Sequence, residues 1–319
     1  MPDLTQAIRT EAEKLFAEGK VELFIGFRPE NSPLHPQPAF FTQANQLDDL
    51  TYGGLCKNNL ATFLPKYPRD KKIGMVVRGC EERAVNILAV ENQHPRENLV
   101  LVGVPCTGII DWRKLVNIYD EDIESVQEGD DELTLLVKGQ THTMKRQDAL
   151  HDSCLRCVHP TPKNADILVG EAIPDREPEQ AWHAALEQSG KAIDARFAWF
   201  KQEAERCIRC YACREACPMC YCEECFVDHI APRWTESGVT PAGMHGWHIV
   251  RAFHQTGRCT DCGACERACP MDIHMTYLTD KLNAEMYAKY GFEAGMDSTT
   301  QAPFATFSLD DKLRFQDGV

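Results

Sequence analysis

Cys-Ile-Arg-Cys-Tyr-Ala-Cys-Arg-Glu-Ala-Cys-Pro, residues 207–218, is the stretch that decides the fold of the second half of this chain. Residues 259–270 repeat its spacing as Cys-Thr-Asp-Cys-Gly-Ala-Cys-Glu-Arg-Ala-Cys-Pro. Each is a complete Cys-x-x-Cys-x-x-Cys-x-x-x-Cys-Pro run, the spacing that holds 4Fe-4S clusters, and where two runs occur the fourth cysteine of each binds the other cluster. We therefore predict two clusters. Their ligands are Cys207, Cys210, Cys213 and Cys269 for the first, and Cys259, Cys262, Cys265 and Cys217 for the second.

Zinc is the alternative to iron and sulfide, because pairs of Cys-x-x-Cys also form tetrahedral zinc sites. Structural zinc needs only two such pairs, whereas the complete run with its proline occurs here twice, which favours clusters. A disulfide framework is not expected, because the chain starts Met-Pro-Asp-Leu-Thr-Gln without an apolar signal segment and contains no apolar run long enough to span a membrane. Sixteen cysteines in a cytoplasmic protein indicate metal or redox chemistry.

Length and charge limit the number of domains and the classes of partner that the chain can have. The chain has 319 residues, enough for two domains, and its 48 acidic and 34 basic residues give a formal charge of -14. This balance argues against nucleic acid as a partner and favours a protein that docks on basic surfaces. The alternative is that the acidic surface only keeps the protein soluble.

The first half has the pattern of an α/β domain with a mostly parallel sheet. Residues 72–80 and 98–106 are apolar runs that each end in a cysteine, Cys80 and Cys106, and each is followed by a helical pattern. Continuous apolar strands alternating with helices are typical of parallel sheets covered on both faces. Since ligands bind at the carboxyl ends of such strands, we expect Cys80 and Cys106 to lie close together.

Other elements are expected around this sheet. Leucine, isoleucine and phenylalanine at helical spacing predict a helix that ends at Gly19, and a proline-rich stretch predicts a surface loop at 28–50. Gly53 and Gly54 form a turn where the backbone can approach a cofactor closely. The helix that ends at Gly19 spans 4–18, and the remaining elements are a strand at 21–26, helices at 60–64, 81–93 and 111–116, a hairpin at 133–137 and 141–145, and a strand at 165–170.

Five cysteines occur in this first half. For any one of them the simplest interpretation is a small buried apolar residue. Because two follow predicted strands and two form a Cys-x-x-Cys pair, the set as a whole favours a third cluster. The five are Cys56, Cys80, Cys106, Cys154 and Cys157.

At this point the first half resembles a known family, the beta subunits of deazaflavin-reducing hydrogenases and deazaflavin-linked formate dehydrogenases. The resemblance covers about residues 20–172 and rests on short pieces of sequence rather than on composition. These pieces are Gly53-Gly54, Arg78-Gly79-Cys80-Glu81-Glu82-Arg83, Gly103-Val104-Pro105-Cys106, Cys154-Leu155-Arg156-Cys157 and Ala165-Asp166-Ile167-Leu168-Val169-Gly170.

The resemblance implies a domain that passes electrons between an iron-sulfur cluster and a bound flavin. It implies that Cys80, Cys106, Cys154 and Cys157 hold this third cluster, and that Gly53 and Gly54 lie near FAD where flavin is bound. It also implies partners of the hydrogenase or formate dehydrogenase kind.

The second half resembles the α-helical two-cluster ferredoxins of heterodisulfide-reductase and succinate-dehydrogenase-type electron chains. More than forty residues separate the two cysteine runs, and the helical pattern Trp247–Arg258 leads into the second. His245, His248 and His254 are interpreted as packing or surface groups and not as ligands. A helix is expected from Met271 to Tyr290. The predicted domains are 1–173 (α/β), 174–206 (helical linker, with a helix pair at 179–205), 207–300 (ferredoxin) and 301–319 (tail).

Three further cysteines, Cys220, Cys222 and Cys225, follow the first run within nine residues. Sixteen cysteines divide into four sets of four, so these three with an N-terminal cysteine such as Cys56 would complete a fourth cluster. The alternative is that they tune the first cluster through hydrogen bonds or are redox-active thiols.

The sequence therefore predicts an electron-transfer subunit with several 4Fe-4S clusters, working with hydrogenase, formate dehydrogenase or heterodisulfide-reductase-like partners. One alternative is a flavin enzyme that itself reduces or oxidises a deazaflavin or nicotinamide coenzyme. Another is a zinc-stapled interaction module. No nucleophile with a base, phosphate loop or paired carboxylate site is evident in the sequence, which argues against hydrolysis and phosphoryl transfer.

Overall fold

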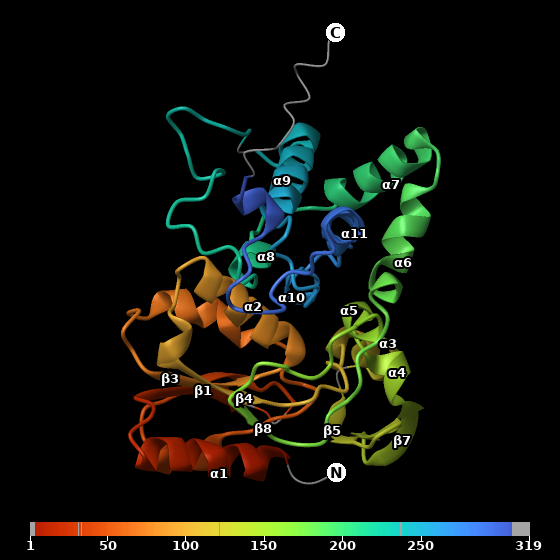
Figure 1. Ribbon diagram of the computed structural model, residues 1–319. Helices are drawn as coiled ribbons and strands as arrows, with labels where there is room; N and C mark the ends of the chain where they lie inside the picture. The colour runs from red at the N-terminus through yellow and green to blue at the C-terminus, as the bar shows by residue number, and fades with distance from the viewer. Residues whose placement is uncertain (1–3, 31, 33, 121, 237, 308–319) are drawn as a thin grey trace.

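The computed structural model describes residues 4–30, 32, 34–120, 122–236 and 238–307. An α/β half with two separate sheets is followed by a helical half that lies over one face of the larger sheet (Figure 1). None of the helices in the described part of the chain has the length and apolar character needed to cross a bilayer.

The larger sheet has five strands in the order β2-β1-β3-β4-β8. β1, β3, β4 and β8 run parallel, and β2 pairs antiparallel with β1 at one edge. Helix α1 (Leu4–Ala17) covers one face and α2 (Gly79–Val90) the other, as Figure 1 shows. The mostly parallel sheet expected from the sequence is confirmed. Its strands are β1 (Leu23–Arg28), β2 (Gln37–Phe41), β3 (Ile73–Val77), β4 (Leu99–Gly103) and β8 (Ile167–Leu168).

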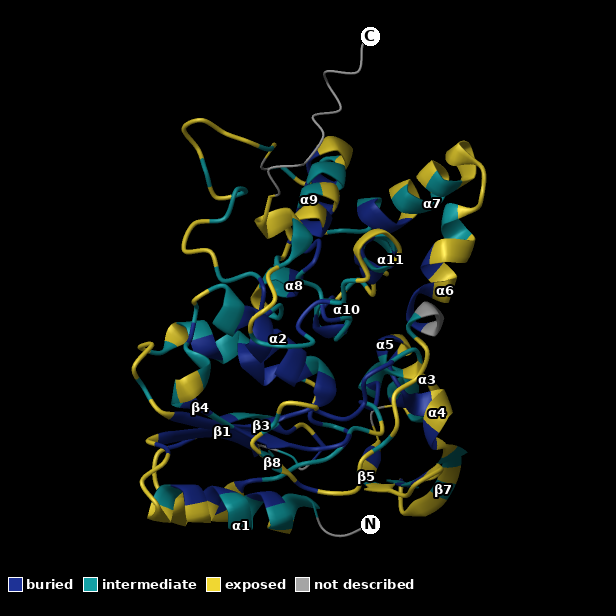
Figure 2. Ribbon diagram, in the orientation of Figure 1, coloured by how far each residue is buried: buried dark blue, intermediate teal, exposed yellow. Residues whose placement is uncertain are grey.

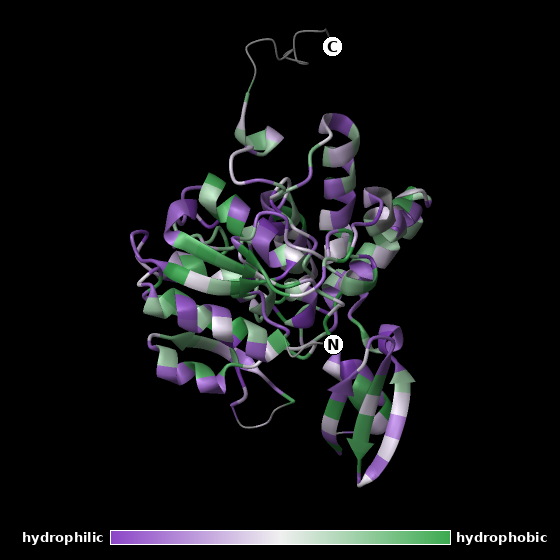
Figure 3. Ribbon diagram, turned by 60° about the horizontal axis from the view of Figure 1, so that its bottom comes forward, coloured by the Kyte–Doolittle hydropathy of each residue, from purple (hydrophilic) through white to green (hydrophobic). Residues whose placement is uncertain are grey.

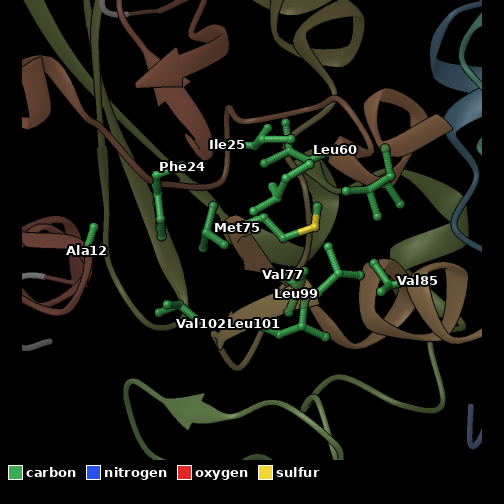
Figure 4. Packing of buried hydrophobic residues seen from close by; sticks show 14 of the residues in the cluster. Ala12, Phe24, Ile25, Leu60, Met75, Val77, Val85, Leu99, Leu101 and Val102 are labelled. Carbon is green, nitrogen blue, oxygen red and sulfur yellow. The ribbon is translucent and has the colours of Figure 1, made fainter. Parts of the chain in front are cut away.

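The core of this half lies between the sheet and its two covering helices (Figure 4). Met75 in the central strand pairs with Ile25 on one side and Leu101 on the other, and all three side chains are fully buried. Burying an aliphatic side chain of this size contributes roughly 1.5–3 kcal/mol. Because helices cover both faces, neighbouring residues of each strand are buried, which explains why these strands are apolar throughout.

The smaller sheet is antiparallel and stands apart from the larger one (Figure 3). It consists of β5 (Ile123–Glu128), β6 (Glu132–Val137) and β7 (Gln140–Lys145). The predicted hairpin is confirmed as β6 and β7, with alternate residues of β6 buried. The sequence analysis missed β5, because its Glu-Ser-Val-Gln-Glu stretch lacks the apolar alternation of a strand.

Within its described residues, the helical half contains four longer α helices and two short ones. The short helices α8 and α10 each begin within a cysteine run, after a residue with left-handed backbone, Tyr211 or Gly263. The chain leaves the last long helix at Gly291, whose φ of +59° suits glycine. The helices are α6 (Pro178–Ser189), α7 (Ile193–Glu205), α8 (Ala212–Glu215), α9 (Pro241–His254), α10 (Ala264–Arg267) and α11 (Thr276–Tyr290).

Several sequence expectations need correction. The region 28–50 is more than a loop, since it contains β2 and a 3-10 helix at Ala44–Asp49. Prolines hide β2 in the sequence, but an edge strand tolerates them. The helix expected at 60–64 is a 3-10 helix, Leu60–Lys66, and the last long helix starts at Thr276 rather than Met271. Within the predicted tail, 308–319 lie outside the described residues.

The first half also contains short α helices, which are α3 (Trp112–Tyr119), α4 (Arg146–Ala149) and α5 (Asp152–Leu155). One of them, α5, carries Cys154. The two halves meet along α2, which is mostly buried (Figure 2). Arg83 Nε donates to the Ala294 carbonyl at 2.9 Å, and Asn86 Nδ2 donates to the Gly295 carbonyl at the same distance. The halves are therefore joined by hydrogen bonds from buried side chains.

Candidate iron-sulfur centres

The carboxyl ends of two neighbouring parallel strands bring the N-terminal cysteines together. Cys80 lies in the first turn of α2, directly after β3, and Cys106 follows β4. Cys154 lies in α5 and Cys157 shortly after it. All four line one cavity of about 390 Å³. The structure thus places the four residues of the predicted third cluster around a common space.

Backbone amides point at two of these sulfurs. The Gly108 N–H donates to Cys106 Sγ at 3.4 Å, and the Ile109 N–H donates to Cys154 Sγ at 3.3 Å. Gly108 has a φ of +105°, and a Cβ there would lie 2.8 Å from the Leu150 side chain. Glycine is therefore needed at this turn, and amides that donate to sulfur stabilise a thiolate and help set a cluster's potential.

Burial makes these thiols poor anions unless positive charge is nearby. Burial raises the pKa of Cys157 to about 12, and the neighbouring thiols of Cys106 and Cys154 raise it further. Burial also raises the pKa of Cys80, with smaller contributions from the thiols of Cys262 and Cys157. A coordinating metal would supply the charge that keeps such thiolates deprotonated.

The first ferredoxin set is also brought together. A small cavity beneath α9 is lined by cysteines of both runs. Burial raises the pKa of Cys213, Arg251 lowers it, and the thiols of Cys207 and Cys269 raise it again. Cys269 therefore lies with the first run, as the exchange of fourth cysteines predicts. The set is Cys207, Cys210, Cys213 and Cys269.

The second set shows the reciprocal exchange. Burial raises the pKa of Cys265, and the thiols of Cys217 and Cys262 contribute to the increase. Burial raises the pKa of Cys259, with Asp261 next and then the thiols of Cys262 and Cys265. Cys217 thus lies near the second run although it belongs to the first.

Arg251 is a candidate functional residue that the sequence analysis missed. It projects from α9, is 5% exposed, and its charge acts on the thiols of Cys265, Cys217, Cys213 and Cys220. A buried cation between anionic centres stabilises them and raises their reduction potential. Its position within an otherwise apolar stretch leading to a cysteine run was the only available signal.

The structure does not support the fourth set as predicted. Cys220, Cys222 and Cys225 line one cavity of about 310 Å³ together with Cys217. Cys56 is not among the described residues that line it. Its thiol is fully buried in the core of the α/β half, where burial raises its pKa to about 12. After the Gly53-Gly54 turn, the Cys56 side chain points into this core, away from Cys220, Cys222 and Cys225.

The Gly53-Gly54 turn does not fit a flavin as it stands. The Gly54 N–H donates to Glu128 Oε1 at 2.6 Å, and Glu128 Oε2 pairs with Arg146 Nη1 at 2.8 Å. A cavity of about 210 Å³ lies beside the turn and reaches Cys106. The amide that would approach a flavin phosphate is thus already taken by a carboxylate, which would repel a phosphate.

The three histidines pack against aromatic or helical neighbours. Burial lowers the pKa of His248 to about 4, with Arg251 and His245 contributing. His245 lies 5.3 Å from the Phe200 ring, and His254 lies 5.1 Å from the Phe226 ring, centroid to centroid. Across the described residues, no three Cys, His, Asp or Glu side chains converge on a single metal ion. Cubane thiolates each bind a different iron, so they need not converge on one point.

The comparisons with known proteins agree with this geometry. A model of the C-terminal part of the coenzyme F420 hydrogenase/dehydrogenase beta subunit matches residues 70–193, and a 4Fe-4S dicluster domain model matches residues 203–273. The chain carries both of these domains. The two domain resemblances predicted from short sequence pieces are thereby confirmed, and so is the prediction of 4Fe-4S clusters. The beta-subunit match contains Cys80, Cys106, Cys154 and Cys157, and the dicluster match contains both cysteine runs.

Two curated relatives extend the likeness over most of the chain. The F420-dependent formate dehydrogenase subunit beta of Methanocaldococcus jannaschii is 27% identical over 82% of this chain and 84% of its own length. The subunit beta of F420-dependent formate dehydrogenase 1 of Methanococcus maripaludis is 22% identical over 82% of each chain. A chain of the F420-reducing [NiFe] hydrogenase complex from Methanosarcina barkeri aligns with a TM-score of 0.43 and 15% identity, covering 57% of this chain and 72% of that one.

Proposed function

We propose that this protein is an electron-transfer subunit of a cytoplasmic, multi-subunit oxidoreductase. The observation that carries the proposal is the cavity of the N-terminal cysteines, because Cys262 of the second ferredoxin run also lines it. The beta-subunit domain and the dicluster domain therefore share one buried space. Two predicted cluster sites meet there, which is the arrangement that a chain of one-electron carriers requires.

Contacts between side chains and backbone fix the site of the N-terminal cysteines next to the site of the second ferredoxin run. A Cβ at Gly263 would overlap the Ser153 hydroxyl, so the loop of the second run lies directly on the segment that leads to Cys154. Arg267 Nε donates to the Lys57 carbonyl at 2.8 Å across the same joint. Close packing between domains keeps the distance between the sites fixed.

The 4Fe-4S clusters supply one-electron chemistry when bound. The chain's own residues do the rest. Cysteines of three sets hold the clusters, Arg251 places a positive charge between two of the sets, and backbone amides donate to Cys106 and Cys154. Cys210 of the first set is exposed, which places that site at the surface where a partner can dock.

The partners we propose are redox subunits of the formate dehydrogenase, hydrogenase or heterodisulfide-reductase kind. The support is the likeness to beta subunits of F420-dependent formate dehydrogenases over most of the chain. Catalysis by this chain alone, with a flavin at Gly53 and Gly54, is disfavoured by the Glu128 carboxylate that occupies the turn.

The deciding measurement is the content of iron, acid-labile sulfide, flavin and zinc per chain in anaerobically purified protein. We expect at least about twelve irons with matching sulfide, four for each of three cubanes, and no stoichiometric flavin. About eight irons would overturn the third site. Stoichiometric flavin would favour the enzyme instead, and zinc in place of iron would favour the zinc-stapled module.

A further inference from the structure

Four cysteines are left over once the three sets are assigned: Cys56, which lies in the core of the α/β half, and three that share a cavity. Cys220, Cys222 and Cys225 all line the cavity of about 310 Å³ between the first cysteine run, α9 and the 3-10 helix Leu60–Lys66. We infer that Cys220, Cys222 and Cys225 hold a fourth iron-sulfur cluster in this cavity, without any contribution from Cys56. This site goes beyond the three sets on which the proposed function rests.

A buried positive charge, the guanidinium of Arg251, lies at the wall of the cavity. Arg251 lines it and is 5% exposed, and its Nε finds no hydrogen-bond partner among the described residues. Its Nη2 lies 3.4 Å from the Cys213 carbonyl oxygen. A buried guanidinium with a free donor is costly unless an anion is close by. A cluster with three thiolates and sulfides is such an anion.

The side chain of Gln255 donates a hydrogen bond to a cysteine sulfur of this cavity. Gln255, 2% exposed at the end of α9, donates from Nε2 to Cys220 Sγ at 3.4 Å. Its Oε1 lies 3.6 Å from Cys217 Sγ. Amide donors to sulfur belong to the outer shell of iron-sulfur sites, where they orient the ligands and tune the potential.

Hydrogen bonds and an ion pair between protein groups hold the cysteine segment at both ends. Tyr221 Oη donates to Glu91 Oε2 at 2.7 Å, and Arg258 Nη2 donates to the same oxygen at 2.8 Å, so Cys220 and Cys222 are tied to the end of α2. Further on, the Cys225 N–H donates to Asp228 Oδ2 at 3.3 Å, and that carboxylate pairs with Arg214. Both ends of the segment are fixed, as a preorganised metal site requires.

Charge pairing singles out Arg251 within this cavity. Of the other cavity-lining arginines, Arg214 pairs with Glu215 and Asp228, and Arg258 pairs with Glu91. Arg251, by contrast, has no carboxylate partner within the described residues; its Nη2 donates to the Cys213 carbonyl oxygen at 3.4 Å and its Nε has no hydrogen-bond partner there. A buried guanidinium without a carboxylate partner at the cavity wall suits an anionic centre next to the ferredoxin pair.

The test compares iron and sulfide per chain in the full-length wild type, a triple variant (Cys220→Ser, Cys222→Ser and Cys225→Ser) and the matched control Cys56→Ser, all purified anaerobically. We expect about sixteen irons in the wild type, about twelve in the triple variant, and the wild-type value in Cys56→Ser. Equal iron in wild type and triple variant would overturn the site. So would loss of a whole cluster in Cys56→Ser, or loss of one zinc instead of four irons.

A second measurement does not depend on the triple variant folding. Native mass spectrometry of the anaerobic wild-type chain gives the mass of all bound cofactors directly. A mass for four clusters supports the inference, and a mass for three or fewer overturns it. Because the first three sets contribute at most about twelve irons, failure here is distinguishable from failure of the proposed function.

Discussion

At the scale of single residues, the buried charge of Arg251 affects the pKa of the neighbouring cysteine thiols. Arg251 lines the cavity of Cys220, Cys222 and Cys225, and its charge lowers the pKa of Cys213 in the first set and of Cys265 in the second, against the larger effect of burial. Its neighbours are cysteines rather than a carboxylate partner, so its charge is available to whatever the cysteines hold. Sequence position alone did not reveal this.

Replacing Arg251 with glutamine should lower the reduction potentials of the two ferredoxin clusters. Two unit charges about 6 Å apart at an effective dielectric constant of about 20 interact by roughly 3 kcal/mol, or on the order of 100 mV for one electron. Anaerobic redox titration followed by EPR measures the shift. Lys201→Gln, which removes an exposed cation on α7, is the matched control and should leave the potentials in place. A shift of equal size in both variants would contradict the assignment.

A buried histidine that lines none of the three cysteine cavities makes stability depend on pH. His94 is fully buried, its Nε2 lies 3.2 Å from the Lys71 carbonyl oxygen, and burial lowers its pKa from 6.5. As the pH falls below 6.5 the unfolded chain takes up this proton first, so the free energy of unfolding declines until the lower folded pKa is reached.

The pH effect is testable by denaturant unfolding between pH 7.5 and 5.5 under anaerobic conditions. We expect His94→Gln to flatten the decline below pH 6.5, because glutamine keeps a donor for Lys71 but does not titrate. His183→Gln, on α6, is the comparison variant. An unchanged slope in His94→Gln would show that other groups cause the decline.

At the scale of elements, the start of α2 holds one wall of the N-terminal cysteine cavity. Gly79 precedes Cys80, and a Cβ at Gly79 would overlap the His159 carbonyl oxygen. That carbonyl belongs to the segment that follows Cys157. The helix and the cysteine segment can approach this closely only because the position is glycine.

Gly79→Ala should therefore push the two cysteine-bearing segments apart and cost the third cluster. We expect iron content to drop by about four per chain while the ferredoxin signals persist. Gly246→Ala is the control, since a Cβ at Gly246 in α9 meets nothing within 4 Å and should stabilise that helix by about 1 kcal/mol. Full iron content in Gly79→Ala would mean that the cavity wall does not need this contact.

At the scale of the whole molecule, the joint between the halves matters most, because Cys262 reaches the cavity of the N-terminal set only across it. Asn86, fully buried in α2, donates to the Gly295 carbonyl, and Gly295 has a φ of +76° and lies so close to Arg83 that a Cβ would overlap the Arg83 carbonyl oxygen. A buried hydrogen bond left unmade costs about 1–3 kcal/mol.

Asn86→Ala should loosen this joint without removing any cysteine. Hydrogen exchange of residues 292–296 and of the Cys262 loop should become faster, while iron content stays at the wild-type value. Asn98→Ala is the matched control, because Asn98 makes a similar bond, to the Arg69 carbonyl at 2.9 Å, within the first half. Faster exchange in both variants alike would point to a general loss of stability rather than to the joint.

The sequence by itself determined the local features. The two cysteine runs, the continuous apolar strands before Cys80 and Cys106, and the helix pair at 179–205 could all be predicted, because ligand spacing and periodicity are properties of neighbouring residues. It did not show β5, whose polar stretch is a strand only through its pairing with β6.

Only the tertiary structure decided which distant residues meet. Cys56 is buried in the core, away from Cys220, Cys222 and Cys225. Glu128 accepts the hydrogen bond of the Gly54 amide. Arg251 lies among thiols of both runs. Counting cysteines had paired Cys56 with the other three. The physical reason is that burial and long-range packing are set by how the halves dock, and no short window of sequence contains that information.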